Sequence, residues 1–191
     1  NVLVLIQNGE LINIKYKENL SYQENKYFGK LFEGESTFYD ESLSTYITNK
    51  DMCINDENQL YIKQIFEDDL YDLSTDLNLS NVLLIAGSRP ENVYTCDERK
   101  TILKSISLRD NKAVVFTGPS INESSTNGVY SGQSFIYEAG KMLDISKPYT
   151  SSLLINDINI DELKRKNKTI KTNNTYPVTI SVNFKESKYD L

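Results

Sequence analysis

The pattern that most constrains the fold is a strand, a helix and a second strand in the middle of the chain. Residues 82–86 and 113–116 are short, continuous apolar runs, typical of strands buried on both faces. Between them, Thr95 followed three residues later by Glu98 matches a capping box, which predicts a helix that begins there and ends near Arg109. This order predicts two parallel neighbours in one sheet, and therefore an α/β fold.

The flanking segments predict further strands. Asn8 and Gly9 separate two apolar runs, and an Asn-Gly pair in that position is the strongest short signal of a β-hairpin. Strands are also predicted where apolar residues alternate or run together: 60–66, 129–137, 142–145, 151–155 and 178–184, with short strands near Phe38 and Tyr46 in the irregular stretch 16–59. Short helices are predicted within 70–79 and over 161–168. Residues 1–191 are interpreted as a single domain.

Composition argues against several classes of function. Hydrophobic residues make up 39% and charged residues 25% of the chain, as in soluble globular proteins. The net charge of -6 argues against a nucleic-acid-binding face, and no apolar run has the length of a bilayer span. Two cysteines are too few for a disulfide framework, which favours the cytoplasm. Histidine is absent, so a Ser-His-Asp triad, a Cys-His dyad and a histidine zinc site are all excluded.

Some local features have two interpretations. Cys96 lies at the start of the predicted helix, where a thiol gains reactivity from the helix dipole, although an incidental cysteine is the better interpretation. Cys53 lies in a polar stretch and has no evident partner. The acidic run 67–69 offers oxygen ligands to a divalent cation, but such a run is more often a solvated corner. The basic run 164–168 suits an acidic partner, or a solvated helix followed by a linker.

Several short motifs follow one another in an order that resembles a known family. They are Lys-x-x-Leu at 17–20, Glu-x-Lys-x-Phe at 24–28, Gln-Ile-Phe-Glu-Asp at 64–68, Arg…Ser-x-Ser-x-Arg at 99–109, and Glu-Ser-Ser-Thr at 123–126 with Tyr-Ser-Gly-Gln-Ser at 130–134. Together they are similar to the glutaminase domain, of nitrilase or carbon-nitrogen hydrolase type, of glutamine-dependent NAD synthetases. The resemblance covers nearly all of the chain.

The resemblance implies an αββα sandwich that is incomplete at the N-terminal side, because the family's opening portion has no counterpart among these residues. The family's synthetase domain, which uses ATP and Mg, has no counterpart either, so no cofactor and no metal site are expected in this chain. Expected partners are glutamine or a related amide, a synthetase domain and further copies of the chain. Nucleic acid and membranes are not expected partners.

The family hydrolyses an amide with a cysteine nucleophile, a glutamate base and a lysine that stabilises the oxyanion. By resemblance, Lys17 takes the oxyanion role, and Glu24 is a second carboxylate that orients the lysine or the substrate. The base falls in the family's opening portion. Phe66 stands at the position of the cysteine. The resemblance also implies three contacts to the substrate: Glu67, Ser88 and Tyr130.

Phe66 separates two functional hypotheses. Its side chain has no nucleophilic atom and no titratable proton, so covalent catalysis at this position is excluded and the chain is expected to be inactive. The first hypothesis is a glutaminase domain of the NAD synthetase family that has lost its reaction. The second is a non-catalytic nitrilase-fold module for binding or assembly, and a third is an unrelated α/β binding protein. Lys17 also has a plainer interpretation, as a solvated loop lysine.

Overall fold

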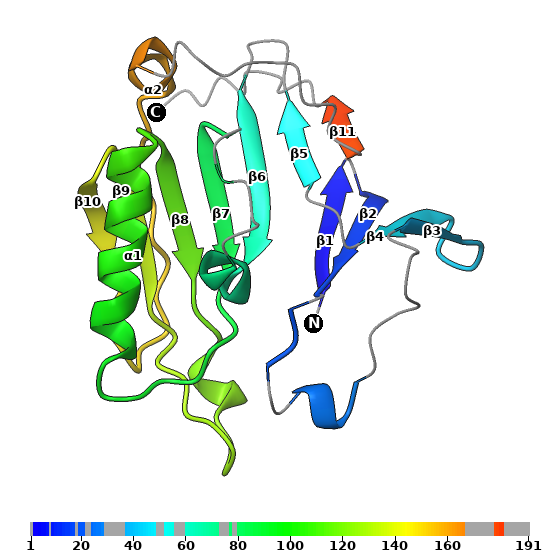
Figure 1. Ribbon diagram of the computed structural model, residues 1–191, viewed down its shortest axis with the longest axis horizontal. Helices are drawn as coiled ribbons and strands as arrows, with labels where there is room; N and C mark the ends of the chain where they lie inside the picture. The colour runs from blue at the N-terminus through cyan, green and yellow to red at the C-terminus, as the bar shows by residue number, and fades with distance from the viewer. Residues whose placement is uncertain are drawn as a thin grey trace.

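The structure is a computed structural model that describes residues 2–7, 9–17, 19–21, 24–28, 37–48, 52–55, 60–72, 77, 80–166 and 178–181. Within these residues the chain forms a seven-stranded sheet, a four-stranded sheet and two α-helices (Figure 1). The mixed α/β class that the sequence predicted is therefore confirmed. None of the described helices is long and apolar enough to cross a membrane.

The larger sheet has the strand order β10-β9-β8-β7-β6-β5-β11. Its members are β5 (Met52–Asn55), β6 (Tyr61–Phe66), β7 (Val82–Ala86), β8 (Ala113–Thr117), β9 (Ser134–Glu138), β10 (Lys141–Ile145) and β11 (Val178–Ser181). The three central strands, β6, β7 and β8, run parallel. The strand–helix–strand pattern predicted this pairing for β7 and β8, and the parallel pairing of β6 with β7 was not predicted. Their carboxyl ends therefore meet at one edge of the sheet, where parallel α/β sheets commonly bind ligands.

Helix α1 (Thr95–Arg109) lies across one face of this sheet (Figure 1). Leu103 and Ile106 of the helix are buried against a cluster of strand residues that alternate along β6 to β9 and so share one face. The cluster consists of Ile65, Leu83, Ile85, Val114, Phe116, Phe135 and Tyr137. This core fixes α1 and the central strands relative to one another.

The predicted extent of α1 is confirmed, but the predicted capping box is wrong. Thr95 is already helical, and the cap residue is Tyr94, whose side chain makes no capping bond. The side-chain oxygen of Asn92 instead accepts hydrogen bonds from the backbone N–H groups of Tyr94 and Thr95, at 2.8 and 3.0 Å. An Asn three residues before the first helical residue thus satisfies donors at the helix start.

The smaller sheet has the order β1-β2-β4-β3. Its strands are β1 (Val2–Gln7), β2 (Glu10–Tyr16), β3 (Thr37–Asp40) and β4 (Thr45–Thr48). The predicted hairpin is confirmed, because β1 and β2 are antiparallel, Gln7 lies opposite Glu10, and Gly9 has a φ of 83°, which L side chains rarely adopt. The short strands predicted near Phe38 and Tyr46 are confirmed as β3 and β4.

Strand β1 lies against the face of the larger sheet that α1 does not cover. Gln64, Leu84 and Val115 occupy matching register positions on that face, and with Leu3 they line a cavity of about 210 Å³ between the sheets. Three apolar residues of β1 are exposed: Val2, Val4 and Ile6. Strand β1 is the edge strand of the smaller sheet.

Some predicted elements need correction. Residues 129–133 form no strand, so the strand predicted over 129–137 begins only at Ser134. Residues 151–155 form no strand, and Leu153 and Ile155 are 81% and 79% exposed. Strand β5 was not predicted at all. Apolar alternation produces a strand only where a neighbour accepts its backbone hydrogen bonds, and no described strand pairs with 151–155.

The remaining short helices also differ in their bounds. Helix α2 (Ile160–Lys166) confirms the helix predicted over 161–168. The acidic run begins a 3₁₀ turn, η2 (Glu67–Tyr71), and most of the helix predicted within 70–79 lies outside the described residues. Two further 3₁₀ turns, not predicted, are η1 (Glu24–Lys26) and η3 (Ile121–Glu123). Strand β11 accounts for residues 178–181 of the predicted strand 178–184, and residues 182–184 lie outside the described residues.

Candidate functional site

The carboxyl ends of β6, β7 and β8 form one wall of a cavity of about 290 Å³. Phe66, Ala86 and Thr117 end the three strands, are paired in register, and all line the cavity. Val2 and Leu3 of β1 also line it, so the cavity lies between the two sheets. The remaining lining comes from the loops that follow β7 and β8: Gly87, Ser88, Gly118, Pro119, Glu123 and Tyr130.

Two glycines allow these loops to approach one another. A Cβ on Gly118 would lie 2.5 Å from the backbone oxygen of Gln133, and a Cβ on Gly87 would lie 2.9 Å from the Cα of Gly118. The Gly118 N–H donates to that same oxygen of Gln133 at 2.9 Å. The position of the loops, and with it the shape of the cavity, therefore depends on residues without side chains.

Lys17 lies beside this cavity and is held by two carboxylates. Its Nζ is 2.8 Å from Oε2 of Glu24 and 2.5 Å from Oδ2 of Asp68, and its side chain is only 1% exposed. Burial works to lower the pKa of Lys17, but the hydrogen bonds and charges of Asp68 and Glu24 outweigh it, so the pKa lies above its ordinary value. Lys17 is therefore a buried, charged residue, and its interpretation as a solvated loop lysine is wrong.

Glu24 is fixed by its own turn as well as by Lys17. Its Oε2 accepts a hydrogen bond from the Ser21 N–H at 2.7 Å, and the Ser21 hydroxyl is 3.3 Å from the Glu24 N–H. Burial works to raise the pKa of Glu24, whereas the bonds from Lys17 and Ser21 lower it, and the net result is a pKa below its ordinary value. The pair Lys17 and Glu24, which the family resemblance singled out, is thus a charged pair in the structure.

Glu67 lies behind the cavity. Its side chain is fully buried, and Oε1 accepts a hydrogen bond from Nε of Arg99 at 2.7 Å. Oε2 accepts hydrogen bonds from the backbone N–H groups of Ser88 and Arg89, at 2.9 and 3.0 Å. Arg99 also pairs with Glu91. These contacts tie the end of β6 to α1 and to the loop after β7, and they occupy the oxygens of Glu67.

Asp68 joins the lysine to the cavity wall. Its Oδ2 accepts a hydrogen bond from the Ser88 hydroxyl at 2.5 Å and contacts Lys17. Asp69 accepts one from the Phe66 N–H at 3.0 Å. The prediction that residues 67–69 form a solvated corner is therefore wrong, because each carboxylate has a cation or an N–H or O–H donor. No cluster of three metal-ligating side chains occurs among the described residues.

Phe66 brings an inert ring to the wall of the cavity. It is 3% exposed and lines the cavity. Its assignment to the position of the family's nucleophile rests on the motif resemblance and stays a prediction. Of the two cysteines, Cys96 packs against the core beneath α1, on the other face of the sheet, and the side chain of Cys53 lies outside the described residues. None of the described residues that line the cavity is a cysteine.

The structure separates the predicted site residues into three places. Phe66, Ser88 and Tyr130 line the cavity. Lys17 and Glu24 form a pair that reaches it through Asp68, and Glu67 lies behind it. Their contacts to a substrate stay predictions. Two further residues had no assigned role in the sequence: Asp68, which lay within the matched motif, and Glu91, for which no local signal exists.

Comparison with known proteins identifies the fold. No protein-family model and no curated protein matches the sequence. Among solved structures, the chain is similar to the glutamine-dependent NAD(+) synthetase of Cytophaga hutchinsonii, with a TM-score of 0.60 and 18% identity over 78% of this chain and 25% of that one. The glutamine-dependent NAD+ synthetase of Acinetobacter baumannii, in complex with ADP, has a TM-score of 0.54 and 16% identity over 80% and 27%.

A third similar structure is shorter. The carbon-nitrogen hydrolase of Helicobacter pylori G27 has a TM-score of 0.54 and 14% identity, over 87% of this chain and 59% of that one. The chain thus spans about a quarter of the length of the two synthetases and somewhat more than half of the hydrolase. At these identities the likeness shows the fold: the chain has the nitrilase-like fold of carbon-nitrogen hydrolases, in the form found in part of the glutamine-dependent NAD synthetases.

Proposed function

We propose that this chain is a glutaminase-type domain of the NAD synthetase lineage that binds a small amide, or the corresponding acid, without hydrolysing it through a covalent intermediate. The observation that carries the proposal is Phe66 in the wall of the cavity. Covalent amide hydrolysis requires a nucleophilic atom next to the substrate carbonyl, and a phenyl ring offers none. The apolar ring instead adds contact area for the alkyl part of a ligand.

The state of Lys17 supports the same proposal. A lysine that stabilises an oxyanion must direct its charge at the oxygen that becomes negative. Here the ammonium is already compensated by Asp68 and Glu24, at 2.5 and 2.8 Å. A negative charge that developed in the cavity would compete with two fixed carboxylates for this cation, so the gain in the transition state is small.

The polar groups of the cavity remain suited to binding. Ser88, Thr117, Glu123 and Tyr130 surround a space bounded on its other sides by apolar residues. Polar groups that converge on one hollow can fix the orientation of a small ligand. Glutamine and glutamate fit this chemistry, because each has a short alkyl chain between polar ends. A synthetase domain is the partner that the lineage implies, and the cytoplasm is the compartment that it implies.

The proposal is tested by two measurements on the same preparation. Ammonia release from L-glutamine is followed over hours, and binding of L-glutamine and L-glutamate is measured by calorimetry. We expect no ammonia above the buffer blank, together with saturable binding that is at least tenfold weaker in Tyr130→Ala. The exposed Tyr149→Ala is the matched control and keeps full affinity. Steady ammonia release, or affinity unchanged in Tyr130→Ala, contradicts the proposal.

One observation favours a second candidate, a serine-dependent hydrolase. The Ser88 hydroxyl donates to the Asp68 carboxylate at 2.5 Å in the cavity wall, which is the arrangement of a nucleophile and its base. In that reaction the Ser88 oxygen bonds to the amide carbon, its proton passes by way of Asp68 to the leaving nitrogen as the carbon–nitrogen bond breaks, and water then cleaves the ester. Ammonia release that survives Cys53→Ala and Cys96→Ala but is lost in Ser88→Ala would select this candidate.

A further inference from the structure

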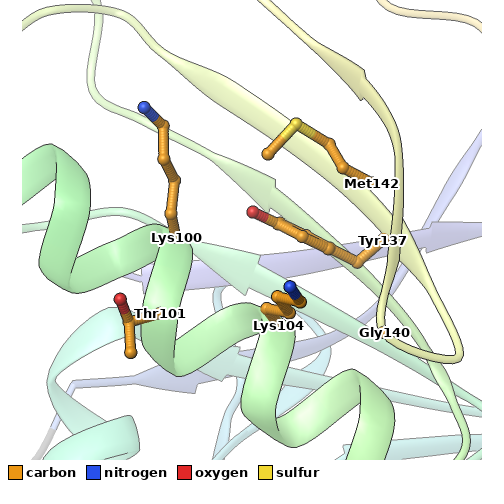
Figure 2. A pocket seen from close by; sticks show the side chains of 6 residues that line it. All are labelled: Lys100, Thr101, Lys104, Tyr137, Gly140 and Met142. Carbon is orange, nitrogen blue, oxygen red and sulfur yellow. The ribbon is translucent and has the colours of Figure 1, made fainter.

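A second cavity, of about 250 Å³, lies between α1 and the hairpin of β9 and β10 (Figure 2). The helix contributes Lys100, Thr101 and Lys104, and the hairpin contributes Tyr137, Gly140 and Met142. Tyr137 belongs to the core cluster beneath α1, whereas Phe66 and Thr117 point to the opposite face. The two cavities therefore lie on opposite faces of the larger sheet and share no lining residue.

The floor of this cavity carries a hydroxyl without a partner. Tyr137 and Met142 lie opposite each other on β9 and β10. Tyr137 is 1% exposed, and Figure 2 shows its oxygen directed toward the Lys100 side of the cavity. Within the described part of the chain this hydroxyl makes no hydrogen bond, although tyrosine hydroxyls that are largely buried usually find one. A donor in an open hollow is a feature that a ligand oxygen would satisfy.

The wall of the cavity carries two positive charges. Lys100 and Lys104 are four residues apart on α1, so their side chains leave the same face of the helix. Lys100 forms a long ion pair with Asp97, at 3.5 Å, whose side chain is 85% exposed, and it also interacts with the Cys96 thiol. No described residue forms an ion pair with Lys104. Like charges at this spacing repel each other, so an anion between them would relieve the repulsion in a chain whose net charge is -6.

The Tyr137 hydroxyl and the ammonium groups of Lys100 and Lys104 together indicate which chemical group the cavity recognises. We propose that this cavity binds the phosphate group of a small ligand, with Lys100 and Lys104 as charge partners and the Tyr137 hydroxyl as the third donor. A phosphate has close to two negative charges near neutral pH and several acceptor oxygens, which three donors from two elements satisfy together. Lysine serves phosphate as a point charge, whereas a carboxylate is better matched by the planar fork of an arginine.

Calorimetric titration with inorganic phosphate at constant ionic strength tests the proposal. We expect one saturable site in the unmodified protein, affinity at least tenfold lower in Lys104→Gln and in Lys100→Gln, and several-fold lower in Tyr137→Phe, which removes only the oxygen. Lys147→Gln removes one charge from an exposed lysine that does not line the cavity, and it keeps full affinity. The absence of saturable binding, or equal losses in Lys104→Gln and Lys147→Gln, would overturn the site.

Two further ligands define its chemistry. Acetate carries one charge and should bind at least tenfold more weakly than phosphate, and equal affinities would refute the assignment to phosphate. Glycerol 3-phosphate separates the two sources of the group. Tighter binding than inorganic phosphate identifies an esterified ligand that extends over Met142, and weaker binding identifies free phosphate. Because neither Lys104 nor Tyr137 lines the first cavity, this result is independent of glutamine binding.

Discussion

The guanidinium of Arg99 and the carboxylate of Glu67 form an ion pair of 2.7 Å in which the two side chains are 1% and 0% exposed. The pair connects α1 to the end of β6 across 32 residues of sequence. The ion pair also holds the Glu67 carboxylate in place to accept hydrogen bonds from the backbone N–H groups of Ser88 and Arg89. A charge in this position is retained only because each partner compensates the other.

Arg99→Ala should therefore lower the free energy of unfolding by about 3–5 kcal/mol, because it leaves buried carboxylates without their cation. Arg109→Ala is the control on the same helix. Its side chain is 66% exposed in the pair with Asp110, so the expected loss is below about 1 kcal/mol. Guanidinium unfolding curves measure both values. Similar losses for the two variants would show that the buried pair contributes no more to the free energy of unfolding than the exposed pair does.

The pair of Lys17 and Glu24 predicts how stability depends on pH. The pKa of Glu24 is lowered from 4.5 in the folded state, so its contribution is present above about pH 4.5 and is lost as the pH falls through the folded pKa. The pKa of Lys17 is raised from 10.5, so its contribution is complete below about pH 10.5 and is lost as the pH rises through the folded pKa.

This pH window is checked by measuring the midpoint of urea unfolding from about pH 3 to about pH 11, a range that spans both transitions. Glu24→Gln should flatten the acid limb of the curve, and Lys17→Met should flatten the alkaline limb. Glu41→Gln changes an exposed carboxylate that lines no cavity and should leave the curve in place. If the acid limb is the same in Glu24→Gln as in the unmodified protein, groups other than Glu24 cause the loss of stability at low pH.

Phe66→Cys places a thiol at the wall of the first cavity. The lost ring contacts should reduce stability by about 2–4 kcal/mol, somewhat less than a Phe-to-Ala change in a core. Iodoacetamide should modify the introduced thiol, and L-glutamine should slow the reaction. Ile65→Cys is the matched control, because Ile65 is the preceding residue of β6 and is fully buried on the α1 face. Peptide mass spectrometry measures both rates, and equal rates would contradict the placement of Phe66.

Gly118→Ala should damage both stability and the cavity. Its Cβ would lie 2.5 Å from the backbone oxygen of Gln133, which also accepts the Gly118 N–H, so the loop after β8 must shift, at a cost of about 1–3 kcal/mol. Gly128→Ala is a milder change, since its Cβ would meet side chains and no backbone atom: Pro90 at 3.1 Å and the Tyr130 hydroxyl at 3.4 Å. Thermal unfolding and L-glutamine titration compare the two. A Gly118→Ala protein that retains stability and affinity would show that the loops can separate.

The central part of the fold could be predicted because its signals are local. The apolar runs of β7 and β8, the helical stretch between them and the Asn-Gly turn of the first hairpin each act within a few residues. The parallel pairing of β7 and β8 then follows from the length and handedness of the crossover. The nitrilase-like fold was predicted from the order of the short motifs, because residue patterns alone do not specify a particular fold family.

The environment of the acidic run could not be predicted for the opposite reason. Glu67 and Asp68 are adjacent and look alike in the sequence, yet one binds Arg99 on α1 and the other binds Lys17 after β2. These partners are distant along the chain, and only the fold brings them together. The same limit applies to residues 151–155, where an apolar pattern has no strand beside it, and to β5, whose pairing with β11 joins the first half of the chain to its end.

The exposed apolar residues of β1 have a consequence for the behaviour of the protein at high concentration. The strand is at a sheet edge, and Val2, Val4 and Ile6 are 54%, 45% and 63% exposed. Its six residues include neither a charged residue nor a proline, which natural edge strands use to prevent pairing between molecules. Aggregation should therefore begin at this edge, and a lysine at Val4 is the smallest change that would act as a gatekeeper against it.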